Sequence, residues 1–226
     1  MAAPDADALI ALPVVGALVG ALAGMIGDGA SRVLGRELGA ALALAALVIL
    51  TGAIHLDGFL DGCDAFFASV APERRLAILK DPHHGTYAVA GMFVAGCCWY
   101  AALVTLAPER EIAALAFAGA LARAAVLPCA FAFPYARIGA APRAFVTRPP
   151  IGAVVATLVV LAVAAYAFAP PYVLLVPALV ALAFVLARTI ARRLDGGLVG
   201  DAYGFLIVIG EVVATVALAW AGAHLE

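Results

Sequence analysis

The chain alternates long apolar segments with short polar breaks along its length. Seven apolar segments result, at residues 8–26, 38–54, 87–107, 112–133, 151–169, 171–187 and 202–223. A helix that crosses the hydrocarbon core of a bilayer needs about 20 mostly apolar residues. The pattern therefore predicts an all-α fold: a polytopic integral membrane helical bundle of about seven transmembrane helices. Pro170 and Pro171 separate two of the segments and favour a tight hairpin over one continuous helix.

Composition supports a membrane protein in the lipid bilayer. Apolar residues make up 66% of the chain and charged residues 12%, whereas an average soluble domain has about a quarter charged residues. Soluble, disordered and collagen-like classes are therefore excluded. The formal net charge of −2 gives no electrostatic reason to expect nucleic acid as a partner. We expect residues 1–226 to form a single transmembrane enzyme domain.

Basic residues predict the orientation of the chain in the membrane. Nine of the 13 Lys and Arg residues fall in the breaks at 55–86, 134–150 and 188–201, three in each. Positive residues are retained on the cytoplasmic side of a membrane. We therefore expect a multi-pass protein of the bacterial cytoplasmic (inner) membrane, with its N-terminus inside and its C-terminus outside. The segment 55–86, on the cytoplasmic side, would then carry the active site.

Three carboxylates are concentrated in that segment. Asp57, Asp61 and Asp64 are spaced i, i+4 and i+7, which on a helix places them along one stripe. Crowded carboxylates repel one another unless a cation or protons neutralise them, and oxygen ligands suit Mg²⁺. Gly58 and Gly62 lie between them and would let a polyphosphate approach the backbone. The spacing thus predicts an interfacial acidic helix with a metal site, although a solvated surface helix would have the same spacing.

Further polar side chains near the stripe are candidates for catalysis and binding. His55 precedes the stripe and either contacts a substrate phosphate or is an ordinary polar residue at a helix start. Lys80 is suited to bind phosphate, although basic residues in this loop could also serve topology alone. Asp81 could complete the metal shell or act as the general base on an attacking hydroxyl. His83 and His84 beside it form either a proton-transfer pair or part of a hydrated loop.

Charged residues elsewhere in the chain point to the same ligand chemistry. Arg123 lies within an apolar segment, where an unpaired charge costs about 3 kcal/mol, so it needs a partner. We favour a role facing phosphate over simple pairing, with Glu211 as the alternative partner. Arg137 lies at the predicted cytoplasmic rim, and Asp201 among glycines forms a second candidate polar site.

Four sequence blocks together resemble the cobalamin synthase family, the adenosylcobinamide-GDP ribazoletransferases. The blocks are TGAIHLDGFLDGCDAF at 51–66, ERRLAILKD at 73–81, FPYAR at 133–137 and GGLVGDAYG at 196–204. The chain departs from the family pattern at Ala65, where Gly is usual, at 82–84, where Ser-Arg-Ile is usual, and at Val208, where Glu is usual. The departure at 208 leaves Glu211 as the only acid of that pair, but the three aspartates of the first block are intact.

The resemblance implies a Mg²⁺-dependent transferase. Its partners would be adenosylcobinamide-GDP and α-ribazole or its 5′-phosphate, and its products adenosylcobalamin or its 5′-phosphate and GMP. Asp57, Asp61 and Asp64 would hold the metal, and Asp81 would take the proton of the attacking hydroxyl. Lys80 and Arg137 would bind phosphate oxygens. His55, Arg123 and Asp201 would complete the substrate site.

Two other classes of protein share parts of this pattern. A CDP-alcohol phosphotransferase would use similarly spaced aspartates on a lipid substrate. A cation-coupled transporter would use buried acids and Arg123 along a permeation path, although here most acids cluster on one predicted face. The sequence leaves the oligomeric state open, a homo-oligomer included.

Overall fold

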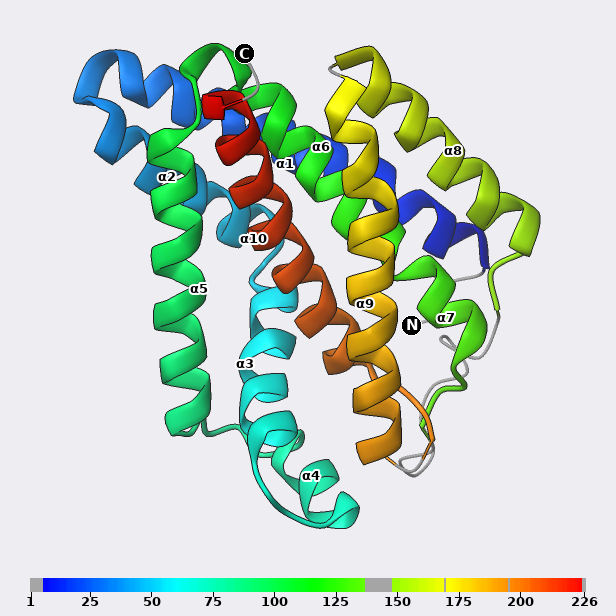
Figure 1. The fold of residues 1–226 in the computed structure, drawn as a ribbon. Helices are drawn as coiled ribbons and strands as arrows, with labels where there is room; N and C mark the ends of the chain where they lie inside the picture. The colour runs from blue at the N-terminus through cyan, green and yellow to red at the C-terminus, as the bar shows by residue number, and fades with distance from the viewer. Residues whose placement is uncertain (1–5, 137–147, 169, 195, 225–226) are drawn as a thin grey trace.

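The computed structural model describes residues 6–136, 148–168, 170–194 and 196–224, and within these ranges the protein is a bundle of helices (Figure 1). The helices are α1 (Ala6–Leu34), α2 (Arg36–Leu50), α3 (Ile54–Phe67), α4 (Pro72–Ile78), α5 (Thr86–Thr105), α6 (Glu111–Ala125), α7 (Leu127–Ala132), α8 (Ile151–Phe168), α9 (Leu175–Arg193) and α10 (Gly200–His224), with 3₁₀ turns at Pro108–Arg110 and Pro170–Leu174. The 3₁₀ turn at Pro170–Leu174 joins α8 to α9, as the two prolines predicted.

Five helical segments are long and apolar enough to cross a membrane in the part of the chain that the structure describes. They are Leu9–Leu34, Thr86–Thr105, Pro108–Ala132, Pro170–Arg193 and Gly200–Gly222. The pair α2 and α3 passes the same test together as a sixth, and α8 is a shorter apolar helix. Valines such as Val89 on α5 and Val163 on α8 are more than 60% exposed, as lipid-facing side chains would be. The predicted polytopic membrane bundle is confirmed.

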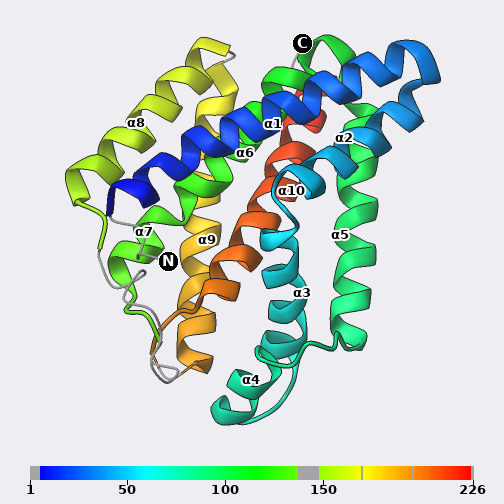
Figure 2. The same ribbon diagram turned by 180° about the vertical axis from the view of Figure 1, so that it is seen from behind.

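The acidic helix α3 packs within the bundle. The chain bends by 92° between α2 and α3. At this bend Gly52 and Ala53 both have positive φ angles, near 60°. Figures 1 and 2 show α3 running beside α5 and α10, and one of its faces, including Phe59 and Phe66, is buried there. The bend after α2 therefore packs α3 against α5 and α10, with Asp64 buried, Asp61 partly buried and Asp57 exposed.

The helices α1 and α6 pack closely through glycines. A Cβ atom on Gly20 would lie 2.0 Å from the carbonyl oxygen of Leu115, and one on Gly16 would lie 2.2 Å from that of Gly119. Small residues four apart let two membrane helices approach to backbone contact. This contact fixes α6, which carries Arg123, against the first helix.

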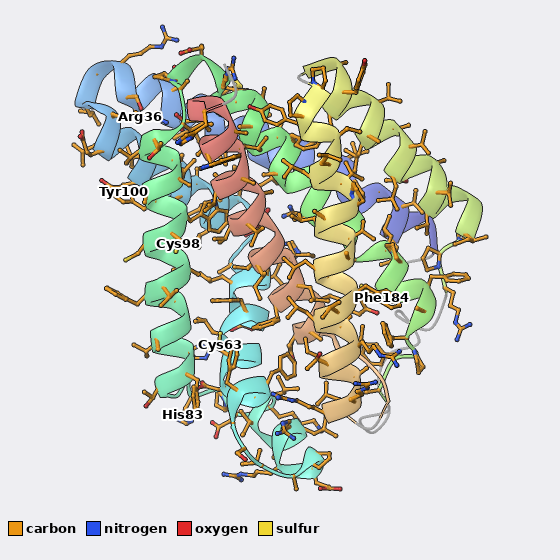
Figure 3. The ribbon with its side chains drawn as sticks, viewed as in Figure 1. Arg36, Cys63, His83, Cys98, Tyr100 and Phe184 are labelled. Carbon is orange, nitrogen blue, oxygen red and sulfur yellow. The ribbon has the colours of Figure 1, made fainter. Side chains whose placement is uncertain are left out.

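An ion pair joins helices at the end of the molecule opposite to α4. Arg36, at the start of α2, donates to the carboxylate of Glu111, and also to the carbonyl oxygens of Leu103 and Leu106 at the end of α5. Figure 3 shows Arg36 at one end of the bundle and His83 at the other. Arg36 therefore satisfies the C-terminal carbonyls of α5 and anchors α2 to the start of α6.

Candidate functional site

A cavity of about 400 Å³ opens where α3 and α10 begin. Its polar side chains come from these two helices: His55, Asp57, Asp201 and Tyr203. The rest of the wall is mainly apolar and comes from the start of α1, the junction of α6 and α7, and α10: Leu9, Leu12, Val126, Leu127, Ala130 and Ile207. A mainly apolar cavity with a few convergent polar groups is typical of a ligand site.

Close packing of α3 on α10 brings two of the predicted acids to this cavity. A Cβ atom on Gly58 would lie 3.0 Å from the Cα and carbonyl oxygen of Asp201, and one on Gly62 would lie 2.7 Å from the ring of Phe205. The two glycines therefore face a neighbouring helix, which differs from the predicted approach of a polyphosphate to the backbone. By allowing α3 and α10 to pack closely, they bring Asp57 and Asp201 to the same cavity.

Asp61 lies one turn beyond Asp57 and has a different environment. Its side chain is only 14% exposed, and its Oδ1 atom is 3.5 Å from Nδ1 of His84. It is also within electrostatic range of the carboxylates of Asp57 and Asp201. Asp61 thus belongs to the acidic group near the cavity, with the more exposed His84 beside it.

Asp64, the last aspartate of the stripe, caps a helix. Its carboxylate accepts hydrogen bonds from the backbone N–H groups of Gly85, at 2.5 Å, and Ala88, at 3.0 Å, at the start of α5. Free N–H groups at a helix N-terminus favour such an acceptor. Among the described residues, no group of three or more His, Cys, Asp and Glu side chains could hold a metal ion. The structure therefore does not assemble the predicted site of Asp57, Asp61 and Asp64, because the stripe extends past the cavity to another helix.

Lys80 and Asp81 lie on an exposed loop and do not line the cavity. The carboxylate of Asp81 accepts hydrogen bonds from the ring Nδ1 of His83, at 2.8 Å, and from its backbone N–H, at 3.0 Å. These hydrogen bonds lower the pKa of Asp81. The structure thus places Asp81 with His83, apart from the polar lining of the cavity.

Arg123 is fully buried and has the alternative partner. It is 1% exposed, and its Nη1 atom donates to Oε1 of Glu211 at 2.7 Å and to the carbonyl oxygen of Gly119 at 2.9 Å. Its Nη2 atom is 3.3 Å from Nδ1 of His55. Arg123 does not line the cavity. The structure thus favours pairing with Glu211 over the expected direct contact with phosphate.

Two basic residues of the predicted cytoplasmic loops cap the acidic helix. Arg75 donates to the carbonyl oxygens of Ala65, at 3.1 Å, and Ala68, at 2.8 Å, and Arg193 donates to that of Phe66. Carbonyls at the end of a helix lack partners within it. The side chain of Arg75 is therefore engaged with the end of α3.

A short bridge joins two distant sequence blocks at the rim of the site. The backbone N–H of Ala136 donates to the carbonyl oxygen of Leu198, and that of Leu198 to Pro134. The pKa of Tyr135 is raised, mainly because the side chain is buried. A hydrogen bond from the backbone of Gly200 offsets part of this rise, and the charge of Asp201 adds to it. Arg137 lies outside the described residues.

Sequence reasoning missed Tyr135 and Tyr203 as residues of this site. Tyr203 lines the cavity, and Tyr135 lies within electrostatic range of Asp201. Both side chains occur in the blocks FPYAR and GGLVGDAYG. Their position two residues from a charged candidate was the available signal, but nothing local distinguishes them from ordinary buried tyrosines.

This chain is similar to a known protein family and to known enzymes that share one name. The model of the cobalamin-5-phosphate synthase family matches residues 3–219. The adenosylcobinamide-GDP ribazoletransferase of Stutzerimonas stutzeri is 34% identical over 215 residues, which cover 93% of this chain and 86% of that protein. That of Pseudomonas aeruginosa is 36% identical over 207 residues, or 89% and 84% of the two chains, and that of Escherichia coli K12 is 30% identical over 215, or 93% and 86%. No solved structure gives a significant match. Because the family model covers nearly the whole chain, this protein belongs to the cobalamin-5-phosphate synthase family.

Proposed function

We propose that this chain is an adenosylcobinamide-GDP ribazoletransferase. It would join adenosylcobinamide-GDP to α-ribazole or its 5′-phosphate, giving adenosylcobalamin or its 5′-phosphate and releasing GMP. The names of its relatives support this activity. The observation that carries the proposal is that the first and last sequence blocks of the resemblance meet at one cavity, while hydrogen bonds join the second block to the first and the third block to the last.

Each block contributes to that meeting point in a definite way. The first block supplies Asp57 to the cavity, and the last supplies Asp201 and packs on it through Gly58. Arg75 of the second block caps the helix of the first. The third block pairs with the last through the bridge between Tyr135 and Leu198. Two blocks thus line the ligand site and the other two are bonded to them, which supports one activity shared with the family.

The carboxylates at the cavity fit a magnesium ion. Mg²⁺ is commonly held by one or two carboxylates, with substrate phosphates and water filling its shell. Asp57 and Asp201 both line the cavity and come from different helices, so two protein ligands suffice and Asp64 is not needed. When bound, the ion would neutralise the charge on the pyrophosphate of the substrate.

The remaining residues would bind the substrate and move a proton. Asp61, half-buried beside the cavity, would accept the proton of the attacking ribazole hydroxyl on its carboxylate. His84, 3.5 Å from Asp61 and partly exposed, would pass that proton to solvent. Tyr203 and the apolar wall would contact the non-phosphate part of a substrate. Lys80, on the exposed loop, would attract the anionic substrate from solution.

The membrane setting follows from the charge distribution. Arg74, Arg75 and Lys80 lie around α4, and Arg192 and Arg193 end α9 at the same end of the bundle. By the positive-inside rule this end would face the cytoplasm. The cavity would then open toward the cytoplasm from the inner membrane, with the N-terminus inside.

The test is turnover by the purified protein in detergent. With adenosylcobinamide-GDP, α-ribazole and Mg²⁺ we expect a new corrinoid product and an equal amount of GMP. CDP-diacylglycerol with an alcohol acceptor should release no CMP. CMP release, or cation flux in liposomes without corrinoid turnover, would instead support the CDP-alcohol phosphotransferase or the transporter and would overturn the proposal.

A further inference from the structure

A buried polar network connects three helices behind the cavity. Arg123 of α6 lies between Glu211 of α10 and His55 of α3. Arg123 is 1% exposed and Glu211 6% exposed. A buried charge is tolerated where a partner and hydrogen bonds compensate it, and here Glu211 and the carbonyl oxygen of Gly119 do so. The hydrogen bonds to Glu211 and Gly119 therefore fix the position of the guanidinium, which also contacts His55.

The contact with Arg123 determines which nitrogen of His55 carries a proton. A guanidinium has only donors and stays protonated in proteins. Its Nη2 atom, 3.3 Å from Nδ1 of His55, must therefore donate to a lone pair on Nδ1. The ring proton then resides on Nε2, because a neutral imidazole has one donor and one acceptor nitrogen. The tautomer of His55 thus follows from the contact geometry.

The ring of His55 lies between the network and the cavity. It lines the cavity together with Asp57 and Asp201, and it also lines a second, smaller cavity together with Thr51 and Glu211. Because Nδ1 is engaged with Arg123, Nε2–H is the ring group left for a ligand. This N–H of a neutral ring would be a hydrogen-bond donor within a site whose charged side chains, Asp57 and Asp201, are acids.

We propose that Arg123 and Glu211 are positioning residues that hold His55 as its Nε2–H tautomer, so that this N–H donates to a phosphate oxygen of the bound substrate. The identity of the phosphate as that of adenosylcobinamide-GDP rests on the proposed function. A fixed donor would orient the pyrophosphate where two carboxylates would otherwise only repel it. Arg123 thus acts on the substrate through His55 and not by contact.

The first test reads the tautomer without any turnover. Nitrogen-15 spectra of the histidine rings, with the His55 signal assigned by its loss in His55→Gln, separate a nitrogen that carries a proton from one with a lone pair. We expect a lone pair on Nδ1 and a proton on Nε2. Addition of Mg²⁺ and inorganic pyrophosphate should shift the Nε2–H signal. A proton on Nδ1, or a signal that pyrophosphate leaves unchanged, would overturn the proposal.

The second test removes the network and keeps the fold. Replacing both members of a buried ion pair by apolar residues is often neutral for stability, so Arg123→Met/Glu211→Leu should melt near the wild-type temperature. We expect loss of the fixed tautomer and a rise in KM for adenosylcobinamide-GDP of about ten- to hundredfold, with KM for α-ribazole unchanged. Glu211→Gln, which keeps an oxygen acceptor for Arg123, serves as a milder variant if the double variant is unstable, with a smaller rise expected. A folded variant with wild-type KM and tautomer would contradict the inference.

Two substitutions of His55 itself distinguish its two nitrogens. A glutamine amide reaches the position of Nε2, whereas the shorter asparagine amide reaches only that of Nδ1. We expect His55→Gln to retain activity within about tenfold and His55→Asn to lose about tenfold more. Equal losses in the two variants would contradict a donor role for Nε2.

Failure of the wild-type protein to release GMP would refute the proposed function. The nitrogen-15 spectra and the binding of pyrophosphate test the network of Arg123, Glu211 and His55 separately.

Discussion

Residues of one type perform different tasks in this protein because their neighbours differ. Asp57 lines the cavity, Asp61 faces His84, and Asp64 caps α5. All three belong to one helix and one stripe of the sequence. The free energy of a carboxylate depends on the donors and charges within a few ångströms, and those come from other helices. Substitution of each acid should therefore have a distinct effect.

Asn in place of Asp57 or Asp201 should weaken binding of the metal. The loss of one carboxylate ligand should raise the Mg²⁺ concentration for half-maximal turnover about tenfold or more. A magnesium titration of GMP release measures this effect. Asp28→Asn is the matched control, because Asp28 pairs with Arg32 on α1. An unchanged magnesium requirement in both Asp57→Asn and Asp201→Asn would contradict the proposed ligands.

Asp61 and Asp81 are the two candidates for the general base. The hydrogen bonds from His83 lower the pKa of Asp81, so Asp81 stays ionised to a lower pH than a free aspartate and is a weaker base. We expect Asp61→Asn to lower kcat at saturating Mg²⁺ about a hundredfold, and Asp81→Asn to change it about twofold or less. Rapid-quench or steady-state kinetics decide between them. The reverse order would return the role to Asp81.

Asp64 should matter for stability and not for the metal. Asp64→Ala removes the acceptor for the N–H groups of Gly85 and Ala88, which should cost about 1 kcal/mol or more of unfolding free energy. Thermal unfolding in detergent measures the loss. The magnesium dependence of the remaining turnover should match that of the wild type. A raised magnesium requirement with normal stability would restore Asp64 to the metal site.

At the scale of the helix, the position of α3 depends on glycines and on basic residues from other helices. Gly58 and Gly62 allow contact with α10, and Arg75 and Arg193 satisfy the carbonyls at its C-terminal end. Arg75 lies 10 residues beyond Ala65 in the sequence, whereas Arg193 lies 127 residues beyond Phe66. The acidic helix is therefore held in the bundle by its packing and its end caps together.

Alanine at position 58 should separate the two helices of the site. Its Cβ atom would meet the backbone of Asp201 at 3.0 Å, and backbone cannot move aside as a side chain can. We expect a loss of about 1–3 kcal/mol in unfolding free energy and reduced turnover.

Gly29→Ala is the control for this change, because a Cβ atom there meets nothing within 4 Å. It should leave stability unchanged or raise it slightly, since alanine favours a helix more than glycine does. The thermal melts of the two variants are compared directly. Equal melting temperatures would show that α3 and α10 tolerate a wider separation.

At the scale of the whole molecule, the two ends have different characters. One end carries α4 and a concentration of basic residues, whereas the other is closed by Arg36 and Glu111. Buried ion pairs require good geometry and further hydrogen bonds to compensate for desolvation, and Arg36 obtains these from carbonyl oxygens of α5. The closed end thus supports the helices that meet at the cavity.

The orientation in the membrane is tested with reporters. An enzyme that is active only outside the cytoplasm, fused after residue 226, should be active, and the same fusion within the loop at 79–84 should be inactive. The positive-inside rule is the physical reason. A reporter that is active only inside the cell at the C-terminus would reverse the topology, and the cavity would then face away from cytoplasmic substrates.

The sequence by itself determined the helices, the membrane class and the helix that carries the acids, because apolar length and helical period are local properties. It also placed the hairpin at Pro170 and Pro171, since proline restricts its own backbone. Only the tertiary structure decided that Asp64 caps α5, that Gly58 lies against the backbone of α10, and that Arg123 pairs with Glu211 beside His55. These outcomes depend on which groups meet through space, and residues 88 positions apart in the chain carry no local signal of their contact.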